Sequence, residues 1–202
     1  MRVVAGSAKG HPLVAPKGER TRPTSDRVKE ALFSSLQPRL PGAVVLDLYA
    51  GSGALGIEAL SRGAGHAVLV ERDARARTCI ERNLTTTRLG DRATVVAGTA
   101  PAVCTTPAVA ERTYDLVLAD PPYAIDPDEL TATLAAVVDL LAPDALVVVE
   151  LASRGAPPAW PPGLGAGRTR RYGDTTLHEG HRTAEPDPDV HRDPTSPSQD
   201  DT

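Results

Sequence analysis

Short apolar runs alternate with helical spacing along the middle of the chain. The run at 43–49 ends in a glycine turn, and Leu55, Ala59 and Arg62 then recur at helical spacing. The unit repeats beyond residue 65, where Asp73 can cap the next helix. This pattern predicts buried strands at 43–49, 66–71, 93–97, 114–120 and 145–151, a clear helix at 128–141, and a weaker, proline-interrupted segment at 99–112.

Strands that alternate with helices indicate a mostly parallel sheet covered on both faces. Near the C-terminus, segments 168–172 and 175–179 flank Gly173-Asp174, which is a hairpin turn signal. In front of the sheet, a helix capped by Thr24 or Ser25 follows strand and turn material in residues 2–13. We therefore predict an α/β, Rossmann-like fold. It has a mostly parallel seven-stranded sheet, helices on both faces, an antiparallel C-terminal hairpin and a short N-terminal strand and helix extension.

Composition changes this picture mainly at the two ends of the 202 residues. The hydrophobic content of 41% and charged content of 24% are ordinary for a globular domain. No apolar run has the length of a membrane span and no signal core is visible, so a cytoplasmic protein without a membrane partner is expected.

Charge is segregated along the chain. Residues 1–41 carry eight basic and three acidic residues, a net charge of +5, whereas 183–202 carry six acidic and one basic residue, a net charge of −5. We expect a basic extension (1–41) packed on a main domain (42–182) and facing a polyanionic partner, followed by a disordered acidic tail (183–202). On charge alone, a merely solvated basic face is an equal alternative.

The turn after the first strand, 51–56, has the G-x-G-x-x-G spacing of a dinucleotide site, with Glu71 twenty residues after Gly51. Asp47 opposes that interpretation, because a carboxylate about 4 Å from a pyrophosphate costs about 4 kcal/mol at an effective dielectric of about 20. S-adenosylmethionine offers an ammonium and a sulfonium instead, so Asp47 favours it. Glu71 suits the ribose hydroxyls of either ligand. Ser52 and Gly53 lie in the same turn, and Tyr49 beside it is expected to pack rather than to take part in catalysis.

The fourth strand ends in Asp120-Pro121-Pro122-Tyr123. Two prolines fix the backbone and remove two amide donors, so nearby carbonyls are presented rigidly. A flat ring stacked on Tyr123 can donate the protons of an exocyclic amino group to Asp120 and to the Pro121 carbonyl. Accepting both protons localises the nitrogen lone pair and directs it at an electrophilic methyl group. In isolation, such a motif is equally compatible with a proline-rich turn that ends a strand.

The remaining metal and thiol candidates are weak. Cys79 and Cys104 lack the spacing of a zinc site and are expected to be small buried residues. His178 and His181 are three residues apart on an expected strand or turn, which directs their rings to different sides, and a third ligand is not evident. We therefore predict no metal site.

The chain resembles the class I S-adenosylmethionine-dependent methyltransferases with an [Asn/Asp]-Pro-Pro-[Tyr/Phe] motif. Within them it is similar to the bacterial RsmD-like family, which methylates the N2 amino group of a guanine in 16S ribosomal RNA. The resemblance spans residues 1–180 and is most specific at 22–33, because generic methyltransferases lack the Arg-Pro-Thr helix opening. It is carried by the stretches 2–10, 22–33, 46–59, 120–123 and 172–177.

The resemblance implies a set of site residues. S-adenosylmethionine would bind around Asp47–Gly53 and Glu71, and Asp120–Tyr123 would hold the guanine. The basic extension would contact 16S rRNA, within small-subunit ribosomal particles. Many relatives place an acidic residue after the third strand to bond the adenine amino group, whereas this chain has Gly98-Thr99-Ala100, so Thr99, Ala100 and backbone groups are expected to serve there. The expected RNA contacts are Arg2, Lys9, Arg20, Arg22 and Arg27.

Two other functions stay open at this stage. A DNA amino-methyltransferase acting on adenine N6 or cytosine N4 could use the same four residues at 120–123. A non-catalytic RNA-binding assembly factor could keep the fold, although the joint presence of Asp47, Gly51, Gly53, Glu71 and Asp120 argues against lost chemistry. An NAD-dependent oxidoreductase ranks last, because no hydride-relay histidine lies near a strand end.

Overall fold

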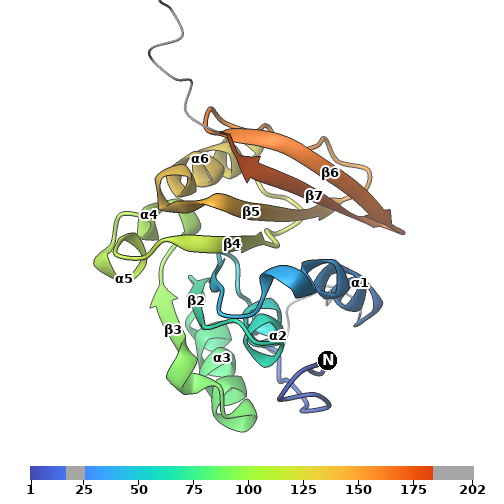
Figure 1. Cartoon of the computed structure of the whole chain (residues 1–202), viewed down its shortest axis with the longest axis vertical. Coiled ribbons are helices and arrows are strands. Elements are labelled where there is room, and N and C mark those ends of the chain that lie inside the picture. Colours follow the sequence, from blue (N-terminus) through green and yellow to red (C-terminus); the bar gives the residue numbers. More distant parts are fainter. Residues whose placement is uncertain (17–25, 184–202) are drawn as a thin grey trace, which may run out of the picture.

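The computed structural model of the protein describes residues 1–16 and 26–183. The helices are α1 (Asp26–Leu36), α2 (Ala54–Ser61), α3 (Ala74–Thr87), α4 (Ala100–Val103), α5 (Pro107–Ala110) and α6 (Pro127–Val137), with 3₁₀ turns at Gln37–Arg39, Gly90–Arg92 and Val138–Leu140. The strands are β1 (Val44–Asp47), β2 (His66–Glu71), β3 (Ala93–Ala97), β4 (Tyr114–Ala119), β5 (Leu141–Ala152), β6 (Leu164–Tyr172) and β7 (Thr175–Arg182) (Figure 1).

The seven strands form one sheet in the order β3-β2-β1-β4-β5-β7-β6. Strands β1 to β5 are parallel, and β7 runs antiparallel to both β5 and β6. The order reverses at β1, whose Leu46 is aligned with Val68 of β2 and with Val117 of β4. Ligands of open α/β sheets bind beyond the carboxyl ends of the strands at such a switch point. The predicted fold class is therefore confirmed, and the glycine turn after β1 lies at the switch point.

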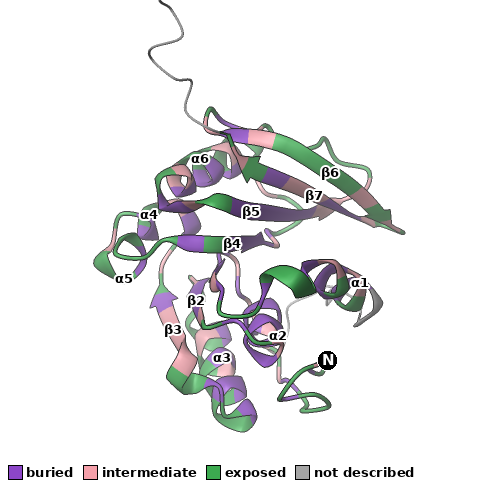
Figure 2. Cartoon of the chain, in the orientation of Figure 1, coloured by how far each residue is buried: buried purple, intermediate pink, exposed green. Residues whose placement is uncertain are grey.

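Helices cover both faces of the sheet (Figure 1). Apolar residues of α1, α2 and α3 share one core cluster with inward-facing residues of the sheet, including Leu116 and Val148. Apolar residues of α4, α5 and α6 share a second cluster with the other face, including Val117 and Val149. Because both faces are covered, β4 and β5 are buried over most of their length, whereas the edge strand β6 is largely exposed (Figure 2).

Several element boundaries differ from the sequence prediction. Helix α6 ends at Val137 and a 3₁₀ turn follows it, so the helix predicted at 128–141 is too long. Leu141 is already extended, and Pro143 disfavours helical geometry at residue 142. Strand β5 therefore begins at Leu141 rather than at residue 145. The expected hairpin is longer than predicted, 164–172 with 175–182, because a register shift between Ala166 and Thr169 interrupts the alternation of side chains.

The N-terminal segment is less regular than expected. Residues 1–16 contain no strand, only a single antiparallel bridge between Arg2 and Pro12. The predicted caps Thr24 and Ser25 lie outside the described residues, and so does the predicted tail (183–202) beyond its first residue. Cys104 is buried, as predicted, but Cys79 is only half-buried because it lies beside the buried stripe of α3 rather than on it. No helix in the described part of the chain is long and apolar enough to span a membrane.

Candidate active site

Three acidic residues lie at the carboxyl edge of the sheet, around the switch point. Asp47 is the last residue of β1, Glu71 is the last residue of β2, and Asp120 directly follows β4. Since β1 lies between β2 and β4, the three carboxylates are neighbours, and the charges of Asp120 and Glu71 both raise the pKa of Asp47. The structure thus brings together the acidic residues that the sequence singled out separately.

Asp47 is buried and incompletely hydrogen-bonded. Its Oδ2 accepts a hydrogen bond of 3.0 Å from the backbone N–H of Gly56, in the first turn of α2. Its Oδ1 is the one buried side-chain oxygen or nitrogen without a hydrogen-bond partner among the described residues. Burial is the main cause that raises the pKa of Asp47 to about 7, and the Gly56 hydrogen bond opposes that rise. A buried acceptor of this kind is expected to attract a donor or a cation.

Glu71 anchors the glycine turn. Its Oε2 accepts a 2.8 Å hydrogen bond from Gly51 N–H, and its Oε1 accepts a 2.7 Å hydrogen bond from Asp73 N–H. Asp73 in turn caps α3 by accepting from the amides of Arg75 and Ala76, which confirms the predicted cap. A carboxylate oxygen has two lone pairs, so both oxygens of Glu71 can accept a further bond from a ligand hydroxyl.

The turn itself needs glycine at its closing position. Gly53 has a φ of 79°, in the left-handed region, and it is the N-cap of α2. Its amide donates to the Ala50 carbonyl at 2.6 Å, which closes the turn. Ser52 is buried in the same turn, and the Tyr49 hydroxyl lies 3.2 Å from Thr133 Oγ1 of α6. The contact agrees with the packing role expected for Tyr49.

Asn83 of α3 is a site residue that the sequence reasoning missed. Its Nδ2 donates to the carbonyls of Ser52 and Val14, both at 2.9 Å, and its Oδ1 accepts from Val14 N–H at 2.9 Å. The side chain therefore connects the glycine turn to the N-terminal segment. The sequence signal that could have identified Asn83 is a polar residue at a position that shares the apolar face of α3 with Ile80 and Leu84.

The predicted adenine contacts lie after β3. Thr99 is exposed and is the N-cap residue of α4, and Ala100 is its buried first residue. The preceding Gly98 donates its N–H to the Glu71 carbonyl at 3.4 Å, which holds the end of β3 beside the end of β2. The backbone and hydroxyl groups of Thr99 are therefore at the same edge of the sheet as Glu71.

The motif at 120–123 leaves the sheet directly after β4. Pro121 is buried, and the Pro122 carbonyl accepts a 2.9 Å hydrogen bond from Ile125 N–H, which closes the turn that follows. The Tyr123 side chain is 58% exposed, and together with Met1 it is one of the two large apolar side chains exposed in the described part of the chain. An aromatic ring that is held beside a rigid turn and a carboxylate can stack a flat ligand.

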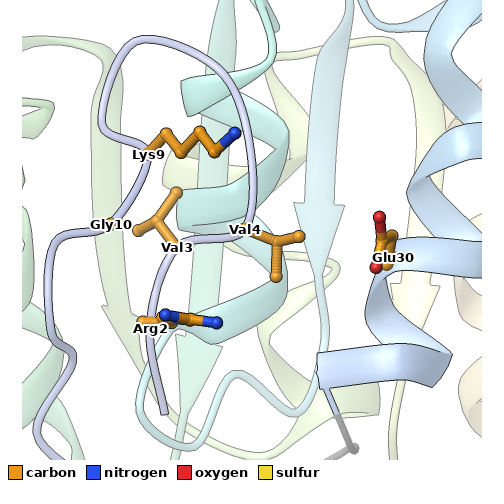
Figure 3. A pocket seen from close by; sticks show the side chains of 6 residues that line it. All are labelled: Arg2, Val3, Val4, Lys9, Gly10 and Glu30. Atoms are coloured by element: carbon orange, nitrogen blue, oxygen red, sulfur yellow. The ribbon is translucent and has the colours of Figure 1, made fainter.

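Two of the predicted RNA contacts share one surface hollow. Arg2 and Lys9 line it together with Val3, Val4, Gly10 and Glu30 of α1. Figure 3 shows both basic side chains extending from the N-terminal loop toward the side on which Glu30 lies. Arg2 and Lys9 are exposed, as RNA contacts must be. Arg20 and Arg22 lie outside the described residues, and the same holds for the side chain of Arg27.

A buried charge cluster fixes that N-terminal loop to α2. Glu58 is fully buried and accepts hydrogen bonds from the amides of Val4 and Ala5, at 2.8 and 3.0 Å, and from Arg62 Nε at 2.7 Å. Lys29 Nζ lies 3.7 Å from Glu58 Oε2 and donates to the Arg2 carbonyl at 2.6 Å. Lys29 was counted in the basic face, but it is only 1% exposed, so it contributes to this cluster rather than to the surface.

The two histidines of the hairpin face opposite sides of the sheet. His178 is aligned with Val149 and His181 with Leu146, and these two partners belong to different core clusters. The predicted divergence of the two rings is therefore confirmed. The described residues contain no group of three or more His, Cys, Asp or Glu side chains placed to hold a metal ion.

Comparison with known proteins gives a consistent result. The family model described as Conserved hypothetical protein 95 matches residues 1–180. The chain is 34% identical over 190 residues to ribosomal RNA small subunit methyltransferase D of Escherichia coli K12, covering 94% of each protein. It is 41% identical over 150 residues to YlbH of Bacillus subtilis, a protein named as an rRNA methyltransferase, covering 74% of this chain and 82% of that one.

Solved structures agree. An Escherichia coli protein named as a methyltransferase, yhhF, superposes with a TM-score of 0.76 at 33% identity, covering 92% of this chain and 99% of that one. A hypothetical protein of Thermus thermophilus gives a TM-score of 0.72 at 31% identity, covering 89% and 98%. With its fold, its edge of three carboxylates and these relatives, the chain belongs to the Conserved hypothetical protein 95 family, that of the RsmD-like methyltransferases.

Proposed function

We propose that this protein transfers a methyl group from S-adenosylmethionine to the exocyclic N2 amino group of a guanine in 16S ribosomal RNA. The observation that carries the proposal is the pairing of a strongly exposed Tyr123 with Asp120 at the end of β4, next to the buried Asp47 at the end of β1. The end of β4 offers a surface on which a base can stack, and the end of the neighbouring β1 offers an anion for a cationic methyl donor.

The residues after β1 and β2 fit S-adenosylmethionine better than a dinucleotide. A buried carboxylate oxygen that lacks a partner among the described residues matches an ammonium group, whereas it would repel a pyrophosphate. Glu71, oriented by the amides of Gly51 and Asp73, would accept the ribose hydroxyls. Ser52 and Gly53 would line the same pocket, while Thr99 and Ala100 would contact the adenine.

Asp120–Tyr123 would hold the acceptor. The guanine would stack on Tyr123, and its amino group would donate to the carboxylate of Asp120 and to the Pro121 carbonyl. Since the Pro122 carbonyl already accepts from Ile125 N–H, the Pro121 carbonyl is the better candidate of the two. Both acceptors draw the lone pair of the amino nitrogen away from the ring.

When bound, S-adenosylmethionine supplies a methyl group activated by its sulfonium. The protein's own contribution is positioning, which can lower the barrier by about 7–11 kcal/mol when two reactants are held in line. Asp120 would also stabilise the positive charge that grows on the amino nitrogen as it is methylated. A base within folded RNA must be exposed or flipped outward to reach this site.

The name of the Escherichia coli relative supports RNA of the small ribosomal subunit as the substrate. The exposed Arg2 and Lys9 would contact RNA phosphates, and the same role is proposed for Arg20, Arg22 and Arg27. The buried ion pair of Glu58 with Lys29 would keep the loop that carries Arg2 in place.

The test is transfer of tritiated methyl groups from S-adenosylmethionine to unmodified 16S rRNA, as naked RNA and as an assembled small subunit, followed by digestion to nucleosides. Labelled N2-methylguanosine is the expected product. Transfer only to DNA, as N6-methyladenine or N4-methylcytosine, would replace the substrate while keeping the site. Donor binding without transfer to any nucleic acid would contradict the enzymatic proposal and favour an assembly factor.

A further inference from the structure

The C-terminal hairpin ends at the same edge of the sheet as the acceptor motif. Strands β5 and β6 both run antiparallel to β7, so β6 is parallel to β5 and to β4. The arrowheads of β4, β5 and β6 accordingly point to the same side (Figure 1). The residues at the carboxyl end of β6 therefore face the same solvent as Asp120.

The register of the strands gives the distance between the carboxyl end of β6 and the acceptor motif at 120–123. Arg170 of β6 is aligned with Leu177 of β7, which is aligned with Glu150 of β5. Because Ala119 is aligned with Val149, the next residue, Asp120, continues the row of Glu150. Arg170 and Asp120 are thus three strand spacings apart in one row, about 14 Å. A short stretch of single-stranded RNA extending from a bound base can cover that distance.

The charges of this strand are confined to its half at the carboxyl edge. Positions 164–167 carry no charge, whereas 168–171 contain three arginines and no acidic residue. Arg168 and Arg171 are exposed, and Arg154 after β5 is exposed at the same edge. Arg170 is partly covered, and its Nη2 lies 3.3 Å from Glu179 Oε1, so its charge is balanced within the hairpin.

The backbone that carries these arginines is fixed. Ser153, next to Arg154, donates its N–H to the Asp174 carbonyl at 2.8 Å and its hydroxyl to the Gly173 carbonyl at 3.0 Å. Arg171 Nε donates to the same Gly173 carbonyl at 3.2 Å. The segment after β5 and the turn of the hairpin therefore form one unit that presents basic side chains at the catalytic edge.

Protection of an edge strand against aggregation also favours charged residues. That requirement applies to the whole length of β6, which is exposed along most of it (Figure 2). It gives no reason for the arginines to gather in the half next to the acceptor motif. Binding of a polyanion at that edge does give one.

We infer that Arg154, Arg168 and Arg171 form a second phosphate-binding surface, which we call the hairpin arginine surface, for the RNA strand that flanks the target base. This inference rests on the proposed function for the identity of the polyanion. Along the sheet, this surface lies on the β6 side of β4, whereas α2, to which the N-terminal loop is fixed, packs against β1 and β2 on the other side of β4.

The test compares two double variants. Arg168→Ala with Arg171→Ala removes two charges from the hairpin arginine surface, and Arg82→Ala with Arg112→Ala removes two exposed charges from elsewhere. RNA binding is measured directly, by fluorescence anisotropy with an unmodified 16S rRNA fragment over a series of salt concentrations. Thermal unfolding checks that both variants fold like the wild type.

The hairpin variant is expected to bind RNA about tenfold more weakly than the control variant at low salt. Its plot of log affinity against log salt becomes less steep by about 0.7 for each arginine that contacts a phosphate of single-stranded RNA. Replacement of both arginines by lysine is expected to restore most of the slope, because the charge remains. The affinity of the alanine hairpin variant for S-adenosylmethionine, measured by calorimetry, is expected to equal that of the wild type.

Equal RNA affinity and equal salt slope in the two double variants would overturn the inference. A matching DNA strand that binds better than RNA and loses more affinity in the hairpin variant would overturn the assignment to RNA. Binding is measured apart from methyl transfer, so a wild-type protein that methylates no RNA would contradict the proposed function alone. In that case, weaker binding by the hairpin variant would still support the hairpin arginine surface.

Discussion

Asn83 holds the carbonyl of Ser52 at 2.9 Å and thereby links helix α3 to the glycine turn at the switch point of the sheet. The same carboxamide pairs with both backbone groups of Val14. One buried side chain thus contacts both the turn that would hold the methyl donor and the N-terminal segment that precedes Arg20 and Arg22 in the chain. Disturbing Asn83 is expected to affect both.

Replacing Asn83 with Leu is expected to destabilise the protein by about 2–4 kcal/mol, because the buried carbonyl of Ser52 and the partly buried backbone groups of Val14 lose their partner. The affinity for S-adenosylmethionine is expected to fall as well, since the turn loses its fixed position. Urea unfolding and calorimetric titration of the donor measure the two effects.

Thr87→Val is the matched control for Asn83. Thr87 is also buried on α3, but its hydroxyl donates only within the helix, to the carbonyls of Asn83 and Leu84. Its replacement is expected to cost less than about 1 kcal/mol and to leave donor affinity unchanged. Equal losses of stability and of donor affinity in the two variants would contradict the linking role of Asn83.

Glu58→Gln is expected to destabilise the protein by about 3–5 kcal/mol, because it removes the buried negative charge that Lys29 Nζ and Arg62 Nε both contact. Lys29→Met is expected to cost less, since Glu58 keeps Arg62 and two backbone amides. The double variant Lys29→Met with Glu58→Gln is expected to be more stable than the sum of the single effects implies. Chemical denaturation of all four proteins measures this coupling, and strict additivity would show that the two charges do not interact.

The sequence predicted the sheet because its signals are local. An apolar run, a glycine turn and an amphipathic helix each occupy adjacent residues, and so does the Asp120–Tyr123 motif. The roles of Glu58, Lys29 and Asn83 depend on contacts that join residues 27 to 69 positions apart, which no local pattern encodes. Lys29 illustrates the limit, because its charge suggested a surface position while its buried partner lies on another helix.

The predicted ends of helices and strands were wrong where one local pattern favours continuing an element and another favours ending it. Apolar spacing continued the predicted helix through Leu141, but the chain is already extended there, and Pro143 disfavours helical geometry at residue 142. In β6, a register shift hides the alternation by which a strand is recognised. The sequence did not predict a role for the hairpin arginines, because their nearness to the acceptor motif depends on the direction of β6 relative to β4, which follows only from the order of strands in the sheet.

Asp120→Ala is expected to lower methyl transfer by at least about a hundredfold while donor binding is retained, because the amino group loses its charged acceptor. Asp126→Ala is the control in the same loop. Asp126 Oδ1 accepts from Asp128 N–H as the cap of α6, so its loss costs about 1 kcal/mol of stability and leaves transfer largely intact. Single-turnover transfer to unmodified rRNA measures both. An active Asp120→Ala protein would refute the role of this carboxylate.

Asp47 is expected to make donor affinity and protein stability respond to pH in opposite directions. Its pKa of about 7 in the folded protein exceeds the ordinary value of 3.8, so the folded state holds this proton more tightly than the unfolded chain does. The stability that it contributes is complete below about pH 4 and is lost as pH rises through 7. Donor binding needs the ionised form instead, so its affinity is expected to weaken about tenfold for each pH unit below 7.

Calorimetric titration of S-adenosylmethionine and chemical denaturation between pH 5 and 8 measure both trends. Asp47→Asn is expected to bind the donor weakly and to flatten both pH profiles, because the titrating group is gone. Asp120→Asn retains Asp47 but removes a charge that raises its pKa, so the midpoint of the donor-affinity profile is expected to move to lower pH. A midpoint that stays in place would show that the two carboxylates do not interact, and the acceptor and donor sites would then titrate independently.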